Sequence, residues 1–289
     1  MVSFKHMSRP LRIEYPGALY HVMSRGNASQ DIFLDEMDRH LFLKNLRHCI
    51  KQQNLICHAY CLMGNHYHLL IETPDANLSE SMRDINGNYT QCFNVKHERV
   101  GHLMQGRYKA FVIEKDLYLL EVVRYIVNNP VMAKLVTHPK DWKWSSYKTT
   151  AGFVRNPQWL ETNFTLGLFS NKKNEAQKQY QVFVNNDLKK SSPYTEVKEG
   201  VILGSPQFVH WIWQTQSNGS EDIKEIPRDQ RVVGRPTLKE IFDEKMTRDE
   251  RNAAINFAKI RCGYLITEIA RQIGLDPSTV GKMIKSNNS

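Results

Sequence analysis

The chain has 289 residues, of which 41% are hydrophobic and 24% charged, with a formal net charge of +9 and a pI of about 9.2. This length allows a sizeable core and two domains, and the basic excess favours an anionic partner, usually nucleic acid. The apolar runs are too short to span a bilayer, the five cysteines form no disulfide-like pattern and no signal peptide is visible, so we expect a cytoplasmic protein without a membrane partner.

Positive charge gathers in two separated regions. Residues 1–150 contain 19 Lys or Arg against 14 Asp or Glu, residues 151–229 contain nine of each, and residues 230–289 contain 11 against seven. Two basic regions that flank a neutral one indicate two places at which the chain could contact a polyanion.

The first half of the chain predicts the order β-α-β-β-α-β followed by one more helix. The predicted strands are 18–24, 55–63, 66–72 and 108–114, and the predicted helices are 38–53, 78–95 and 116–129. Asp116 is the expected cap of the last helix and Pro130 its stop. This order predicts an α+β fold of the ferredoxin-like split βαβ type, with an antiparallel sheet, helices on one face and the other face open for a ligand.

The third predicted strand begins with two histidines that are two residues apart. Successive side chains of a strand point to opposite faces, so His66 and His68 share one face while Tyr67 and Leu69 can pack in a core. Two neutral imidazoles on a rigid strand are well placed to bind a divalent metal. A His-x-His pair also occurs on ordinary solvated faces, so a metal site requires a third ligand elsewhere.

Two cysteines near this strand superficially suggest a zinc site. Cys57 and Cys61 are four residues apart in one predicted strand, which separates them by about 13 Å. One tetrahedral zinc ion has Zn–S bonds of about 2.3 Å and cannot bind both. We therefore reject this interpretation.

The last predicted helix, LYLLEVVRYIVNN over residues 117–129, places a phenol beside an amide. Tyr125 and Asn129 are four residues apart, so their side chains are neighbours on one face and could reach the two histidines. The plainer interpretation is that Tyr125 packs in the core and that Asn129 merely ends the helix.

Four blocks of sequence resemble one known family in the same order. They read LYHVMSRGN at 19–27, MGNHYHLL at 63–70, GRYKA at 106–110 and RYIVNNPV at 124–131. Over roughly residues 8–150 the chain resembles the single-tyrosine HUH transposases and, within them, the REP-associated tyrosine transposases. It departs from the family pattern at Asn128 and at residues 132–134, away from the proposed ligands.

This resemblance implies cleavage and rejoining of single-stranded, hairpin-containing DNA through a 5′-phosphotyrosine. Tyr125 is then the nucleophile, and His66, His68 and Asn129 hold a divalent cation, Mg²⁺ or Mn²⁺. Mixed imidazole and amide ligation suits manganese well. A cation there would offset charge that develops on the phosphate, and no nucleotide cofactor is required.

Three basic residues flank the proposed site. Arg25, Arg107 and Lys109 could hold the phosphate backbone of a DNA strand. Ordinary surface charge is an equally good explanation for any single one of them.

The C-terminal tail, TEIARQIGLDPSTVGKMIK over residues 267–285, resembles helix-turn-helix units, including that of the bacterial replication initiator. Ala270, Gly274 and Val280 have the expected spacing, with Asp276 and Pro277 opening the second helix. Ser278, Thr279 and Lys282 would then lie on the exposed side of a recognition helix and contact DNA, which could be duplex DNA. The alternative is a helical pair used only for packing.

We therefore expect three regions: a transposase-like catalytic domain at 8–150, a neutral and partly helical connecting region at 151–228, and a helical DNA-binding domain at 229–289. Two functions remain open. One is a metal-dependent transposase and single-strand endonuclease, and the other is a non-catalytic DNA-binding regulator that keeps the fold. The pattern leaves the oligomeric state open.

Overall fold

The structure, a computed structural model, describes residues 13–186, 192–196, 201–218, 237–242, 246–256, 258–259 and 264–286. The chain folds as two compact units. The larger comprises Glu14–Val197 with Ile202–Ser205, and most of the smaller is Pro206–Ser289. The larger unit therefore includes residues beyond 150, and we describe each unit by itself.

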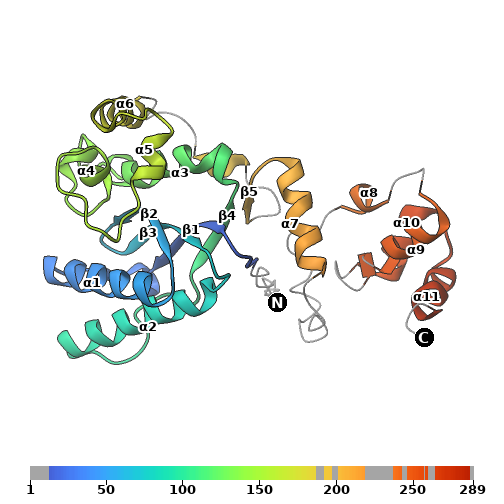
Figure 1. The fold of residues 1–289 in the computed structure, drawn as a ribbon. Helices are drawn as coiled ribbons and strands as arrows, with labels where there is room; N and C mark the ends of the chain where they lie inside the picture. Colours follow the sequence, from blue (N-terminus) through green and yellow to red (C-terminus); the bar gives the residue numbers. More distant parts are fainter. Residues whose placement is uncertain are drawn as a thin grey trace. The chain divides into compact units, whose positions relative to one another are not determined.

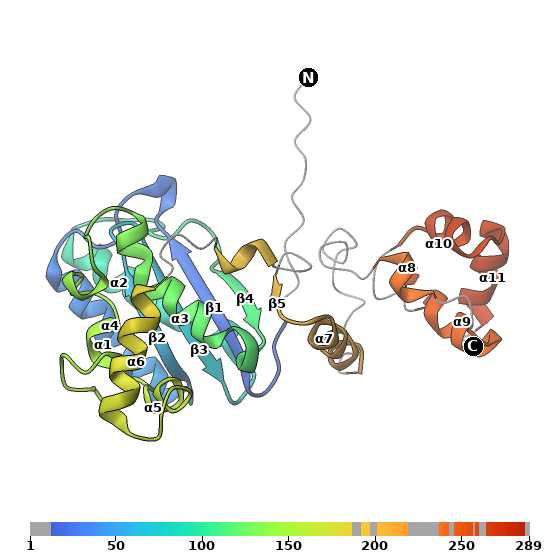
Figure 2. The same cartoon turned by 90° about the horizontal axis from the view of Figure 1, so that it is seen from above.

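The larger unit is built on one mixed five-stranded sheet. Its strands are β1 (Ala18–Arg25), β2 (Ile56–Leu62), β3 (His66–Thr73), β4 (Lys109–Ile113) and β5 (Ile202–Leu203). Their order is β2-β3-β1-β4-β5, antiparallel except for β5, which runs parallel to β4 (Figure 2). The first four strands have the ferredoxin-like order predicted from the sequence, so the α+β fold class is confirmed.

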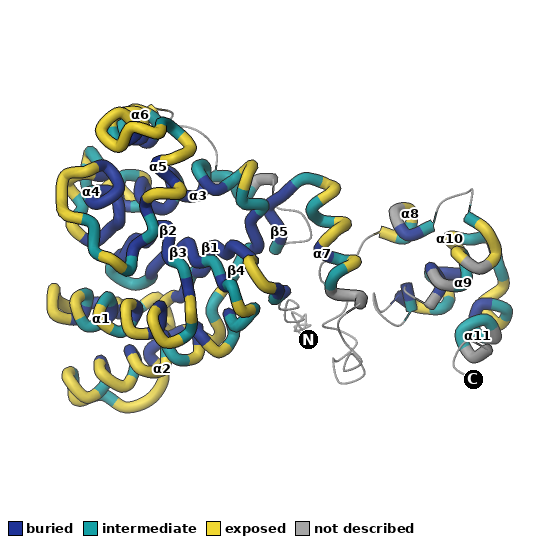
Figure 3. The backbone as a smooth tube through the Cα atoms, viewed as in Figure 1, coloured by how far each residue is buried: buried dark blue, intermediate teal, exposed yellow. Residues whose placement is uncertain are grey.

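Two long helices cover one face of the sheet (Figure 1). These are α1 (Glu36–Gln52), which opens with a capping box between Asp35 and Asp38, and α2 (Leu78–Lys96). They bury an apolar stripe that includes Phe42 and Met82, while their outer sides are exposed (Figure 3). This side of the sheet is therefore a packed core.

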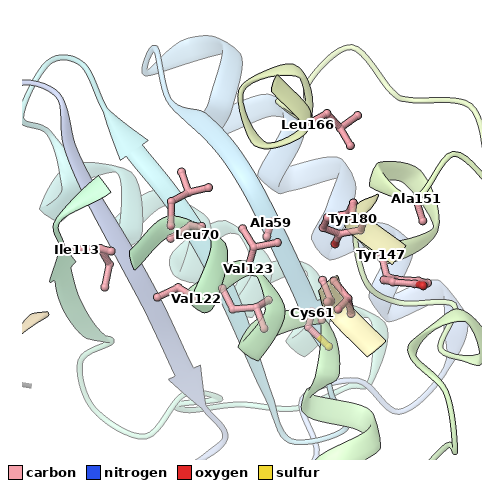
Figure 4. Close-up of a cluster of buried hydrophobic side chains, with 14 of the residues drawn as sticks. Ala59, Cys61, Leu70, Ile113, Val122, Val123, Tyr147, Ala151, Leu166 and Tyr180 are labelled. Carbon is pink, nitrogen blue, oxygen red and sulfur yellow. The ribbon is translucent and has the colours of Figure 1, made fainter. Parts of the chain in front are cut away.

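The second face of the sheet is also covered, which corrects the expectation of an open face. It carries α3 (Lys115–Met132) and, beyond it, α4 (Tyr147–Thr150), α5 (Asn163–Gly167) and α6 (Lys173–Asn185). Figure 4 shows why: large side chains after residue 140, among them Tyr147, Leu166 and Tyr180, pack in one cluster with α3 and the strands. Burial of these apolar residues stabilises the added layer.

The ends of α3 differ from the prediction. Glu114 is the N-cap, so Asp116 lies in the first turn instead of capping it, and the helix continues through Pro130 to Met132. Pro130 has no N–H and removes one hydrogen bond of the helix, but beyond it the Ala133 N–H still donates to the Asn129 carbonyl at 2.9 Å. Asn129 is therefore a true helical residue and not a terminal one.

Three short 3-10 helices connect these elements: η1 (Asn27–Ser29), η2 (Pro139–Asp141) and η3 (Pro193–Glu196). The connecting region at 151–228, which was expected to be partly helical, contains α5, α6 and α7 (Pro206–Asn218). None of the described helices is both long enough and apolar enough to cross a bilayer.

The smaller unit is helical in its described part. It contains α7 (Pro206–Asn218), α8 (Leu238–Ile241), α9 (Arg248–Asn256), α10 (Ile266–Ile273) and α11 (Pro277–Ser286). The last four share a small core in which Ala270 and Val280 are almost fully buried. Gly274 ends α10 with a φ of 67°, a left-handed conformation that favours glycine, so the predicted turn between two helices is present.

Candidate active site

The register of the central strands gathers the predicted ligands on the face that α3 covers. Arg25 of β1 lies opposite His66 of β3, and Met23 lies opposite His68. Directly opposed residues point to the same face, and alternate residues share it. His66 and His68 therefore lie on one face, together with His21 of β1, while Tyr67 points into the core beneath α1 and α2.

The four residues proposed as nucleophile and ligands meet at this face. The His66 and His68 ring centroids are 5.0 Å apart, with ring planes at 82°. The Tyr125 ring presents an edge-on contact to His68 at 6.0 Å. Asn129 follows one turn later on α3, donates from Nδ2 to the Tyr125 carbonyl at 2.9 Å, and lies close enough to His68 to raise the pKa of that imidazole slightly against the larger lowering by burial. Phenol, carboxamide and two imidazoles thus share one small volume.

Hydrogen bonds to the Nδ1 atoms orient both imidazoles. His66 Nδ1 lies 2.7 Å from Oδ1 of Asn65, an oxygen that accepts, so the Nδ1 of a neutral His66 carries the proton and its Nε2 keeps a lone pair. His68 Nδ1 lies 2.9 Å from Nε2 of His21. The remaining nitrogen, His68 Nε2, is buried without a hydrogen-bond partner of ordinary geometry among the described residues. A buried polar atom in this state is expected where a ligand binds.

The electrostatics of the site favour neutral imidazoles. Burial lowers the pKa of His21 to about 3 and that of His68 well below its ordinary value. Burial also lowers the pKa of His66, with a further contribution from the positive charge of Arg25. Neutral imidazole is the form that binds metals, so these shifts keep the pair in its ligating form at neutral pH.

The nucleophile candidate is protonated in this environment. Burial raises the pKa of Tyr125, and a hydrogen bond with the Ser192 side chain opposes that shift. A phenol with a raised pKa is a weak nucleophile, so attack requires removal of its proton or a nearby positive charge. Tyr125 is half-buried, as is Asn129 on the same side of α3.

The donor set fits a divalent metal. No group of three His, Cys, Asp or Glu side chains is gathered as a metal site in the described part of the chain, so a metal here would use two imidazoles and the Asn129 carboxamide. The partnerless Nε2 of His68 is the structural observation that supports this fit. Cys57 and Cys61 are free, buried thiols, and burial raises the pKa of Cys57 to about 12, which opposes thiolate ligation.

Sequence reasoning missed two residues of the site, His21 and Tyr194. Both nitrogens of His21 are engaged, Nε2 with His68 and Nδ1 with the Tyr194 hydroxyl. Tyr194, from η3, also contacts Tyr125 edge-on at 5.2 Å between ring centroids. A single histidine in an apolar strand carries no local signal, and Tyr194 follows a segment without a recognisable motif.

Two other tyrosines, Tyr108 and Tyr118, lie close to Tyr125 in the sequence. The Tyr108 hydroxyl lies 3.3 Å from the Ser79 hydroxyl at the start of α2, on the opposite face of the sheet from the site. Tyr118 lies two turns before Tyr125 on α3, about 10 Å along the helix axis from it and from the contact between Tyr125 and His68. The geometry therefore favours Tyr125 over both.

The proposed DNA contacts fall in two places. Arg25, Arg107 and Lys109 are exposed, and Lys109 lies opposite Met23 on the site face of the sheet. In the smaller unit, Ser278 is exposed and Thr279 half-buried, both in the first turn of α11. Lys282 belongs to α11, but its side chain lies outside the described part of the chain.

Comparison with known proteins gives one family match. Residues 15–129 match the family described as "Transposase IS200 like", a range that includes all four proposed catalytic and metal-binding residues. No curated protein matches the chain at a significant level.

Solved structures show weaker likenesses. A REP-associated tyrosine transposase bound to a REP hairpin is 20% identical, with 54% of this chain and 92% of that chain covered and a TM-score of 0.44. A protein of Deinococcus radiodurans R1 assigned as a transposase is 19% identical over 42% and 96%, with a TM-score of 0.30. The tRNA(His) guanylyltransferase of Saccharomyces cerevisiae is 11% identical over 63% and 84%, with a TM-score of 0.33. All three are remote from this chain in sequence and geometry.

Proposed function

Because residues 15–129 belong to the IS200-like transposase family, we propose that this chain cleaves and rejoins single-stranded DNA with Tyr125 as its nucleophile. The observation that best supports the proposal is the meeting of Tyr125 and Asn129 with His66 and His68 at one point of the sheet. Membership of the family supports DNA transposition as the process that this chemistry serves.

The reaction needs no nucleotide cofactor. The Tyr125 hydroxyl loses its proton and attacks a backbone phosphorus, so that a Tyr Oη–P bond forms while the bond to the 3′-oxygen breaks. The 3′-oxygen leaves with a proton as a hydroxyl, and the 5′-phosphate stays on the protein. Attack of a 3′-hydroxyl on the phosphotyrosine reverses these bond changes and rejoins the strand.

The other residues of the site hold and orient the reactants. His66, His68 and Asn129 would hold a divalent cation, Mn²⁺ or Mg²⁺. Bound there, the cation would offset negative charge that develops on the phosphate. Ser192 holds the Tyr125 side chain through its hydrogen bond. Arg25 and Lys109, exposed beside the site, would hold the DNA backbone together with Arg107.

The substrate that we propose is a strand with a hairpin. The sequence blocks that resemble REP-associated transposases support this choice, because that resemblance implies hairpin-containing DNA. We place the protein in the reducing cytoplasm, where thiols such as those of Cys49, Cys57, Cys61 and Cys92 stay reduced.

The smaller unit would supply a second DNA contact. Its positive charge and the α10–α11 pair, joined by a left-handed Gly274, support a helix-turn-helix that binds duplex DNA through Ser278, Thr279 and Lys282. A protein that uses only this contact and the exposed side chains of Arg25, Arg107 and Lys109 would be a DNA-binding regulator without catalysis. The presence of a residue for every catalytic role favours the enzyme over that alternative.

A denaturing gel separates the two functions. The full chain is incubated with end-labelled single-stranded DNA that contains a hairpin, with Mn²⁺, and compared with Tyr125→Phe. We expect a covalent protein–DNA adduct only with the unaltered chain, while both bind the DNA equally, because Phe keeps the ring contacts and lacks the attacking oxygen. Equal binding without adduct in either protein would support the regulator.

A further inference from the structure

His21 is a fully buried histidine whose two ring nitrogens both have side-chain partners within the candidate site. We propose that His21 is a positioning residue that holds His68 in the tautomer that offers its Nε2 atom to a divalent metal. This inference rests on the proposed function, because it assigns a role toward the metal that His66, His68 and Asn129 would hold.

The two rings share a single proton where they meet. His21 Nε2 and His68 Nδ1 are 2.9 Å apart, a hydrogen-bond distance that accommodates one proton between them. If His68 Nδ1–H donates to His21 Nε2, the Nε2 of a neutral His68 has a lone pair and no proton. If the bond runs the other way, His68 Nε2 carries the proton and cannot bind a metal.

Tyr194 allows the hydrogen bond to run from His68 Nδ1–H to His21 Nε2. When His21 Nε2 accepts from His68, the single proton of a neutral His21 lies on Nδ1, and it needs an acceptor. The Tyr194 hydroxyl oxygen contacts that nitrogen. The chain therefore provides a continuous donor–acceptor series from His68 through His21 to Tyr194.

Packing holds the His21 ring in the orientation that this series requires. Its plane lies within 17° of the His68 ring plane, at 5.1 Å between centroids, and within 26° of the Tyr194 ring at 5.2 Å. Phe111 of β4 lies near the ring as well, at 6.3 Å. A metal-bound histidine commonly donates its second N–H to an orienting group, and loss of that group typically lowers metal affinity about 10- to 100-fold.

The alternative is an ordinary core histidine that only fills space. His58 is a suitable comparison, since it is 2% exposed in the edge strand β2 and its Nε2 lies 2.9 Å from Glu72, outside the site. A residue of that kind contributes to stability alone. His21 differs because its partner is a proposed ligand.

The test uses two substitutions of similar polarity in the full chain. The carboxamide of Gln reaches the place of a histidine Nε2, and that of Asn reaches only the place of Nδ1. His21→Gln can therefore still accept from His68, whereas His21→Asn can contact only Tyr194. Mn²⁺ affinity is measured without DNA by electron paramagnetic resonance titration, with thermal unfolding of the metal-free proteins measured in parallel and His58→Gln as the control.

We expect His21→Asn to weaken Mn²⁺ binding at least about tenfold, His21→Gln to stay within about threefold of the unaltered chain, and His58→Gln to change only the unfolding temperature. Equal Mn²⁺ affinity in the unaltered chain and His21→Asn would overturn the inference, as would equal losses in the Asn and Gln variants. If neither His21 variant folds, the Mn²⁺ affinity of Tyr194→Phe is measured instead. An affinity equal to that of the unaltered chain would show that the hydrogen-bond series from His68 through His21 to Tyr194 does not support metal binding, and would overturn the inference.

Failure of the proposed function gives a different result. If the unaltered chain itself binds no Mn²⁺, or if His66→Ala and His68→Ala bind it normally, the metal site is wrong and the role of His21 falls with it. If those two variants lose Mn²⁺ and His21→Asn does not, the metal site stands and only the present inference fails.

Discussion

Asn129 lies one helical turn beyond Tyr125, and its Nδ2 donates to the Tyr125 carbonyl at 2.9 Å. This bond engages the carboxamide nitrogen and leaves the oxygen available, and the side chain lies close enough to His68 to affect the pKa of that residue. The same side chain therefore holds its place on the helix through its nitrogen while it offers its oxygen to the site.

The first prediction concerns that oxygen. Asn129→Ala should weaken Mn²⁺ binding about tenfold, and Asn129→Asp should raise the affinity for Mg²⁺ relative to Mn²⁺, because magnesium prefers charged oxygen ligands. Calorimetric titration with both metals measures this. Asn128→Ala is the control, since the Asn128 side chain donates to the Val184 carbonyl away from the site. Unchanged affinities in both Asn129 variants would exclude it as a ligand.

A second prediction concerns acid stability. Glu72 of β3 lies 2.9 Å from His58 of β2 and 2.7 Å from Lys115 at the start of α3, so it ties to the sheet the helix that carries Tyr125. These partners lower the Glu72 pKa, chiefly through the hydrogen bond with His58. A carboxyl group whose pKa is lowered by folding stabilises the fold at pH values above its ordinary pKa of 4.5. That stabilisation is lost as the pH falls from 4.5 through the lowered pKa.

Glu72→Gln should accordingly cost about 1–2 kcal/mol in the free energy of unfolding at pH 7, and progressively less as the pH falls below 4.5. Urea denaturation at a series of pH values measures the difference. The matched control is Glu80→Gln, because the Glu80 side chain is 61% exposed and its 3.5 Å contact with Arg83 is a surface pair of little weight. A Glu72 effect that is independent of pH would contradict this account.

A third prediction concerns the turn beside His66. Gly26 N–H donates to the Asn65 carbonyl at 2.8 Å, and a Cβ at Gly26 would lie 2.1 Å from the backbone oxygen of Gln30. Gly26→Ala should therefore destabilise the protein by about 2 kcal/mol or more. Gly87→Ala, in the exposed part of α2 with nothing within 4 Å of the new Cβ, should instead stabilise it by about 0.5–1 kcal/mol. Thermal unfolding of the two variants should shift in opposite directions.

A fourth prediction concerns the helical tail. Ser278 is exposed in the first turn of α11, where a carboxylate is compatible with the helix dipole, so Ser278→Glu should fold normally. A negative charge facing phosphate should cost about 1 kcal/mol in duplex binding, with the loss shrinking at high salt.

Filter binding at several salt concentrations tests the tail, with Gln91→Glu on the exposed side of α2 as the charge-matched control. Cleavage of a short single strand should be unaffected, since the proposed catalytic residues lie in the larger unit. Equal duplex binding by Ser278→Glu and the control would make the α10–α11 pair a packing element.

Local patterns predicted much of the fold and brought four residues of the candidate site together, but they did not indicate His21 or Tyr194. Strand alternation places His66 and His68 on one face, and helical spacing makes Tyr125 and Asn129 neighbours, because both relations depend only on residues a few positions apart. The order of the first four strands followed from the same periodicities. The limits of α3 were wrong by a few residues, since sequence signals such as Asp116 and Pro130 compete with packing that extends the helix.

The remainder of the site depends on long-range packing. His21 reaches His68 only because β1 pairs with β3 in the register that sets Met23 opposite His68, and Tyr194 is 173 residues from His21 in sequence. Neither contact follows from the spacing of residues within one strand or helix, so the sequence pattern does not predict it. The covered face of the sheet was missed for the same reason, because Tyr147 and Tyr180 come from segments whose apolar residues show no clear partner until the fold is formed.

Tyr125 is the residue that we expect to become attached to DNA, and every other role at the site depends on that attachment. The most direct measurement is to form the adduct with a hairpin-containing strand and Mn²⁺, digest the DNA and the protein, and locate the nucleotide-bearing peptide by mass spectrometry. We predict a single modified residue, Tyr125, joined to the 5′-phosphate of the strand that lies downstream of the cleaved bond. A nucleotide on Tyr118 or Tyr194, or cleavage with no modified tyrosine, would contradict this assignment.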